Sequence, residues 1–84
     1  MNKKQRKTLL KIYEKPERSD ISWNDIERLF IALGAEISEG QGSRVRVALN
    51  EVRAVFHRPH PRRVTNKASV KSLRRFLMES GVTP

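Results

Sequence analysis

In the middle of the chain, apolar and polar residues alternate in a way that predicts a β-hairpin. Every second residue of 44–49 is valine or leucine, which is the period-two pattern of a half-buried strand, and residues 52–57 continue as a second strand. A two-residue turn at 50–51 would place Arg44 directly opposite His57. One face of this hairpin is then apolar, and the other face carries Arg44, Arg46, Arg53 and His57.

The best-marked helix of the sequence begins at Ser22. Ser22 and Asp25 have the spacing of a capping box, and Ile21 and Ile26 have the spacing of a hydrophobic staple. Gly34 favours the left-handed conformation that ends a helix. The apolar stripe of this helix consists of Ile26, Leu29, Phe30 and Leu33.

Three further elements are indicated. Residues 3–14 predict a short helix, residues 35–38 a short strand, and residues 67–80 a last helix that Thr65 or Asn66 caps. The core stripe of the last helix is Val70, Leu73, Phe76 and Leu77. We expect its opposite, exposed side to carry Lys67, Lys71, Arg74 and Arg75.

The order of these elements predicts a small α+β protein. A three-stranded antiparallel sheet with two helices packed on one face makes a two-layer sandwich. Residues 1–20 are expected to form an N-terminal helical extension and linker, and residues 21–84 the domain itself. No predicted element covers the basic face of the sheet, so we expect this face to meet water or a partner.

Composition excludes several classes of site. The chain has no cysteine and only two histidines, which are too few for a zinc site, and no phosphate-binding glycine motif is present. We therefore expect no metal and no cofactor. The absence of cysteine suits a reducing cytoplasm, and no apolar run approaches the ~20 residues that span a bilayer.

Charge is distributed unevenly along the chain. Residues 1–43 hold eight basic and seven acidic side chains, whereas residues 44–84 hold ten basic and two acidic ones, in a chain of net charge +9. A basic half of this kind indicates a polyanion, an anionic membrane surface or an acidic protein as partner. A solvated surface that keeps the protein soluble is the plainer explanation. A membrane is less favoured, because the last helix needs its apolar side for the core.

Four short motifs, in this order and spacing, resemble those of a known family. They are Leu33-Gly34-Ala35, Gly42-Ser43, His60-Pro61, and Val70-x-x-Leu73-Arg74-x-Phe76-Leu77 followed by Gly81. From Ile21 to Val82 the chain thus resembles the HicA toxins of bacterial toxin–antitoxin systems. The resemblance implies a fold like the double-stranded-RNA-binding domain and metal-independent cleavage of messenger RNA. It also implies neutralisation by a HicB-like antitoxin, whose complex would set the oligomeric state.

The chain departs from this family at one important position. The family's active-site histidine follows the Gly-Ser pair, and here that position is Arg44. Arginine stays protonated and cannot act as a general base. In the predicted register His57 lies across the hairpin from Arg44 and returns an imidazole to nearly the same point. His57 is therefore our candidate base and Arg44 the donor that stabilises phosphate charge. His60, between two prolines, is a candidate general acid or a solvated loop residue.

The basic residues of this half are candidates for RNA contact. They are Arg44, Arg46, Arg53, Arg58, Arg62, Arg63, Lys67, Lys71, Arg74 and Arg75. Three interpretations stay open: an endoribonuclease, a non-catalytic relative that binds RNA or an antitoxin, and a basic protein that binds an acidic protein. The phenylalanines fall on core stripes, so they are not expected to stack on bases.

Overall fold

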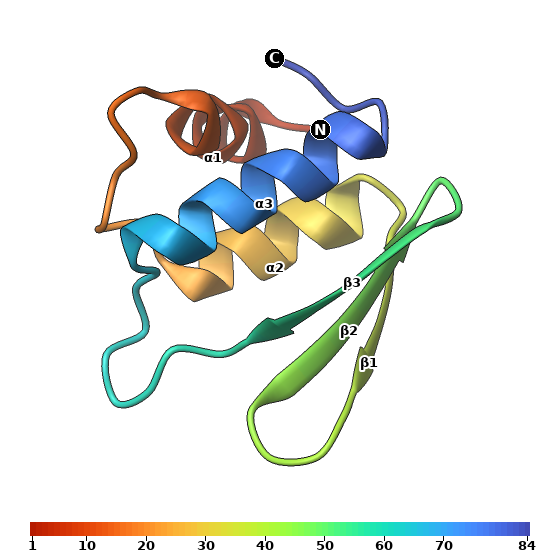
Figure 1. Ribbon diagram of the computed structural model, residues 1–84. Coiled ribbons are helices and arrows are strands. Elements are labelled where there is room, and N and C mark those ends of the chain that lie inside the picture. The colour runs from red at the N-terminus through yellow and green to blue at the C-terminus, as the bar shows by residue number, and fades with distance from the viewer.

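Three helices and a three-stranded antiparallel sheet make up the fold, in agreement with the predicted α+β class. The computed structural model describes residues 1–84. Its elements, in chain order, are α1 (Lys3–Tyr13), α2 (Trp23–Ala32), β1 (Glu36–Glu39), β2 (Arg44–Leu49), β3 (Val52–His57) and α3 (Lys67–Glu79). The sheet has the order β1-β2-β3. α2 packs against β1, α3 packs against β3, and α1 packs against both helices, which leaves the other face of the sheet uncovered (Figure 1).

The β2–β3 hairpin has the predicted register. Leu49 pairs with Val52, and Arg44 pairs with His57. The turn residues Asn50 and Glu51 have φ angles of 49° and 68°, the left-handed values of a type I′ turn. The alternation of apolar residues and the length of the turn therefore predict the strand register that the structure has.

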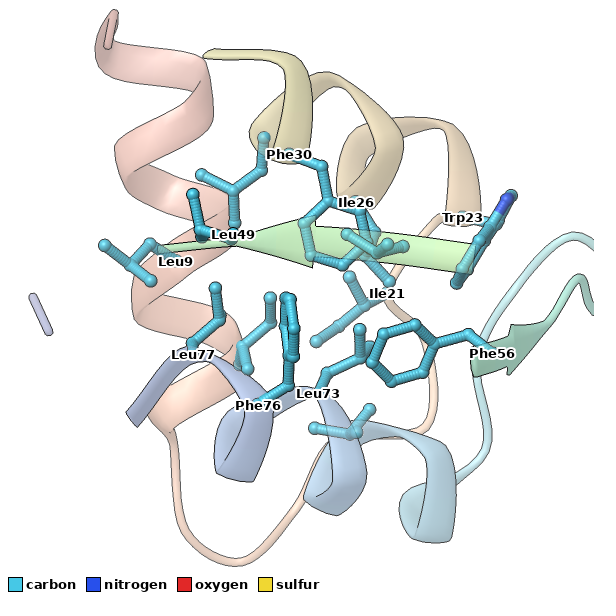
Figure 2. Packing of buried hydrophobic residues seen from close by; sticks show 14 of the residues in the cluster. Leu9, Ile21, Trp23, Ile26, Phe30, Leu49, Phe56, Leu73, Phe76 and Leu77 are labelled. Atoms are coloured by element: carbon cyan, nitrogen blue, oxygen red, sulfur yellow. The ribbon is translucent and has the colours of Figure 1, made fainter. Parts of the chain in front are cut away.

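A single core joins all the elements. Fifteen buried hydrophobic residues form one cluster, and at its centre the rings of Phe30, Phe56 and Phe76 lie with centroids 5.9, 5.8 and 5.6 Å apart (Figure 2). Trp23 is also buried, at 4% exposure. As predicted for the phenylalanines, none of these rings is available to stack on a ligand.

The N-terminal segment contributes directly to this core. Leu9 and Ile12 of α1 are 2% and 0% exposed. The Tyr13 hydroxyl donates a hydrogen bond of 2.6 Å to the carbonyl oxygen of Val82, near the other end of the chain. α1 is therefore packed into the domain, rather than attached only by its linker.

The predicted capping box at Ser22 is wrong. The Ser22 side chain makes no capping hydrogen bond, although its backbone occupies the N-cap position. Instead, Ser22 pairs with Val64 in an isolated β-bridge, and the first amide of α2, on Trp23, donates to the Arg63 carbonyl oxygen at 2.9 Å. The start of α2 is thus held by backbone pairing with the segment around Val64, and not by a side-chain cap. A capping box does form at α1, between Asn2 and Gln5.

Candidate active site

Arg44 and His57 face each other on the uncovered side of the sheet. The Arg58 amide donates to the Ser43 carbonyl oxygen at 2.9 Å, so residues 43 and 58 form a hydrogen-bonded pair. Arg44 and His57 are the next pair in the register and therefore occupy a non-hydrogen-bonded position. Facing side chains at such positions lie about 4.5–5.5 Å apart at Cβ. Both side chains are exposed, so the imidazole and the guanidinium can reach the same bound group.

A tight turn sets the start of β2 and thereby the position of Arg44. The Gly40 amide donates to the Arg44 carbonyl oxygen at 2.9 Å, and a Cβ added at Gly40 would lie 3.2 Å from Arg44 Cβ. Gly42, in the same turn, has a φ of +65°. Glycine at position 40 therefore lets the backbone of the turn lie close to Arg44, and a larger residue there would push the two segments apart.

The sheet face around this pair is basic, with a small apolar centre. Arg46 and Arg53 are exposed and make no ion pair, while Val55 between them is 54% exposed. A shallow hollow of about 490 Å³ lies here, and residues of all three strands line it. The face thus presents guanidinium groups around a wide, open surface, which suits contact with an extended polyanion.

Arg58, expected to contact RNA, is half-buried and bound to two carboxylates of the protein itself. Its Nε lies 3.2 Å from Glu27 Oε1, its Nη1 bonds to Glu39, and Trp23 Nε1 donates to the same Glu27 oxygen. The carboxylates of Glu39 and Glu27 raise the pKa of Arg58. Because Arg58 directly follows His57, these bonds fix the end of β3 to α2 and β1. No local pattern in the sequence points to Glu27 as a residue that positions the site, since it lies 31 residues from Arg58.

His60 lies beside the Gly42-Ser43 turn but not in the same hollow as His57. His60, Ser43 and Arg63 line a depression of about 500 Å³ that also borders Glu27. His57 instead lines a smaller hollow of about 230 Å³ between β3 and α3. The two candidate proton-transfer residues therefore open onto different hollows of the surface.

The expected exposed position of Arg74 on α3 is wrong. Arg74 is buried at 7% exposure, its Nη2 pairs with Glu17, and its Nη1 donates to the Glu14 carbonyl oxygen at 3.4 Å. The segment after α1 covers this side of α3 and supplies both acceptors. A backbone amide and the Arg74 guanidinium hold the pKa of Glu17 below its usual range.

The remaining basic residues of this half are exposed. Arg62 and Arg63 lie in the loop before α3, and Lys67, Lys71 and Arg75 lie on the outer side of that helix. Lys15, which sequence analysis did not single out, joins Lys71 and Arg75 along a groove of about 530 Å³. No three histidine, cysteine, aspartate or glutamate residues cluster in a way that would hold a metal ion. None of the helices has the length and apolar character needed to cross a membrane.

Comparison with known proteins identifies one match. A family model described as the HicA toxin of bacterial toxin-antitoxin systems matches residues 23–82. No curated protein and no solved structure matches the chain. The matched range begins at α2 and ends after α3, so it includes the whole candidate site and leaves α1 outside.

Proposed function

We propose, from the premise that the chain belongs to the HicA family of bacterial toxin–antitoxin systems, that this toxin cleaves messenger RNA without a metal ion. The observation that carries the proposal is the Arg44–His57 pair on an open, basic sheet face. The family implies an antitoxin partner, and we infer that a HicB-like protein fills that role. Since messenger RNA is the substrate, the toxin acts in the cytoplasm.

The proposed chemistry is transfer of a phosphoryl group within the RNA. His57 accepts the proton of a ribose 2′-hydroxyl, whose oxygen then forms a bond to the adjacent phosphorus. The bond from phosphorus to the 5′ oxygen breaks, and that oxygen takes up a proton from His60 or from water. Arg44 donates hydrogen bonds to the phosphate oxygens as their charge grows. The products are a 2′,3′-cyclic phosphate and a 5′-hydroxyl.

RNA binding is assigned to the basic residues whose side chains are exposed. Exposed guanidinium and ammonium groups gain affinity by releasing counterions from the phosphate backbone. Arg58 and Arg74 are omitted, because their guanidinium groups bind carboxylates of the protein itself. The proposed contacts are Arg44, Arg46, Arg53, Arg62, Arg63, Lys67, Lys71 and Arg75.

A second candidate function is a non-catalytic toxin relative that keeps RNA binding or antitoxin binding. Arg44 itself favours this alternative, because it stands where the resemblance places the family's active-site histidine. In this case the basic face would still bind RNA, but no group would be arranged to move the 2′-hydroxyl proton.

The test is cleavage of an end-labelled single-stranded RNA by purified protein in the presence of EDTA. We expect His57→Ala to lower the rate about 10²- to 10⁴-fold and Arg44→Ala about 10²- to 10³-fold. RNA affinity of His57→Ala should stay close to that of the wild type, since the residue is exposed. A substrate with 2′-deoxyribose at the cleaved position should resist. Wild-type protein that binds RNA but never cleaves it would establish the second candidate instead.

A further inference from the structure

The outer edge of β3 is unpaired. β3 pairs only with β2 and forms one border of the sheet. Because residues 43 and 58 are a hydrogen-bonded pair, Arg53, Val55 and His57 occupy the alternate positions, where backbone N–H and C=O groups point away from β2. No hydrogen bond in a turn, loop or cap uses these groups. β3 therefore offers three regularly spaced sets of donors and acceptors, as an added strand requires.

A hollow lies directly beside this edge. It measures about 230 Å³ and lies between β3 and the N-terminal half of α3, which runs along the same border of the sheet (Figure 1). The helix lines it with small side chains, those of Ala68, Ser69 and Ser72. Phe56 of β3 reaches toward Leu73 at its base (Figure 2). An unpaired strand beside a helix, with space between them, is a geometry that accepts an extended peptide.

The surroundings of the hollow are positively charged. No aspartate or glutamate lines it. Arg53 on β3 and Lys67 on α3 are exposed and lie within two residues of residues that line it, and neither makes an ion pair. An acidic occupant is therefore favoured. A second copy of this chain is disfavoured, because two chains of net charge +9 would repel each other.

We propose that an extended, acidic segment of the antitoxin adds to β3 as a fourth strand in the groove between β3 and α3. A protein segment fits better than RNA, because only a peptide backbone matches the spacing of the free groups on Arg53, Val55 and His57. Its acidic side chains occupy every second position and face Arg53. The intervening side chains are small and apolar and face Phe56 and Ser72. The naming of the antitoxin as the source rests on the proposed function.

Strand addition would also explain how the toxin is held inactive. The added strand lies against His57, whose side chain lines the groove. A bound peptide therefore denies RNA access to the proposed base. In this way one contact accounts for both recognition of the partner and loss of cleavage.

A synthetic peptide tests the proposal without the antitoxin and without any cleavage assay. The probe is a capped peptide of about eight residues in which glutamate alternates with valine, and the control peptide has lysine in place of glutamate. Binding is followed by NMR, together with hydrogen exchange of the backbone amides. We expect only the acidic peptide to bind, and to protect the amides of Arg53, Val55 and His57.

Two variants of Val55 provide a matched pair. Val55→Pro removes the outward N–H but no hydrogen bond to β2, whereas Val55→Thr keeps the N–H and the branched shape. We expect Val55→Pro to weaken peptide binding at least about tenfold, and Val55→Thr to change it less than about threefold. If Val55→Pro does not fold, Ser72→Phe, on the exposed side of α3, fills the groove and should weaken binding in the same way.

Several results would overturn the proposal. Strand addition would be contradicted if the acidic and basic peptides bound equally well. It would also be contradicted if Val55→Pro and Val55→Thr bound the acidic peptide with equal affinity. Protection of the same amides by oligouridylate would assign the groove to RNA. Protection in the free protein, together with a doubled mass, would assign the edge to self-association. Because cleavage is not measured, failure of this proposal is distinct from failure of the proposed ribonuclease activity.

Discussion

Two neighbouring arginines on α3 differ completely in what they touch. Arg74 is 7% exposed and binds Glu17 and the Glu14 carbonyl group, both from the segment after α1. Arg75 projects into water, and its Nε lies 4.0 Å from Glu79 in a side-chain pair that is largely exposed. The first arginine therefore supports the fold, and the second is free to contact a phosphate.

The stability of single variants should separate these roles. Arg74→Ala removes a buried side chain together with its bonds to Glu17 and to the Glu14 carbonyl oxygen, so we expect it to lower the free energy of unfolding by about 1–3 kcal/mol. Arg75→Ala should change it by less than about 0.5 kcal/mol. Urea unfolding at neutral pH measures both. Equal losses in the two variants would contradict the assignment of Arg74 to the fold.

RNA binding should respond to the Arg75 variant and not to the Arg74 variant, the reverse of the expected effects on stability. Arg75→Ala removes one of the proposed phosphate contacts, so the slope of log affinity against log salt concentration should fall by about 0.7 for a single strand. Arg74→Ala, measured under conditions in which the variant is folded, should keep the wild-type slope. Titrations of a labelled RNA at several salt concentrations check this. An unchanged slope for Arg75→Ala would assign the outer side of α3 to another role.

Glu17 should also contribute to the pH dependence of stability. Its pKa in the folded protein is lowered by a backbone amide and by Arg74, so the folded state favours the ionised carboxylate. This contribution is present above the unfolded pKa of about 4.3 and is lost as the pH falls through the lower, folded value. Wild-type protein should therefore lose more stability between pH 7 and pH 3 than Glu17→Gln. Glu36→Gln, on the open sheet face, is the control and should behave like wild type.

At the scale of elements, the hairpin turn connects the sheet to the helical layer. The Asn50 side chain donates a hydrogen bond of 2.7 Å to the carbonyl oxygen of Ser80, at the end of α3. Glu51, next to it, adopts a φ of 68° with no side-chain bond of its own. The two turn residues are thus under different constraints, although both have left-handed backbone.

Replacing each turn residue by glycine should have opposite effects. Glu51→Gly relieves a non-glycine residue from the left-handed conformation, and we expect it to raise the free energy of unfolding by about 0.5–1 kcal/mol. Asn50→Gly removes the bond to Ser80 and should lower it. Thermal unfolding of both variants checks the turn, and destabilisation by Glu51→Gly would contradict the type I′ geometry.

At the scale of the whole molecule, α1 belongs to the stable core even though the family match begins at residue 23. Ile12 is fully buried between α1 and the other helices, and Tyr13 is bonded to Val82. A domain of this size has only about 5–15 kcal/mol of stability in total. The loss of one such contact is therefore a large fraction of the free energy that keeps the domain folded.

A pair of α1 variants tests this contribution. Ile12→Ala should lower the free energy of unfolding by about 2–4 kcal/mol, because it leaves a cavity in the core. Leu10→Ala, at a position that is 54% exposed, should change it by less than about 0.5 kcal/mol. Equal effects would mean that α1 is only loosely attached.

Local patterns in the sequence predicted most of the fold and the central pair of the site. The alternation around Val45 and Val47 and the length of the turn determine the pairing of Arg44 with His57, because both are properties of neighbouring residues. The ion pairs of Arg58 and Arg74 could not be predicted. The two partners of Arg58 lie 19 and 31 residues away and the partner of Arg74 lies 57 residues away, and helical or strand spacing carries no information about such contacts. The missing side-chain cap at Ser22 could not be predicted either, because the backbone of Ser22 pairs with Val64, which is distant in the sequence.

The central claim is that an imidazole and a guanidinium act as a facing pair on the open sheet. The most direct measurement exchanges them, by comparing RNA cleavage by Arg44→His/His57→Arg with cleavage by His57→Arg alone. Both variants keep the cationic surface, but only the first restores an imidazole to the pair. We expect the exchanged variant to cleave RNA and His57→Arg to be inactive. If His57→Arg cleaves RNA as fast as the wild type, or the exchanged variant is as inactive as His57→Arg, the account of this site is wrong.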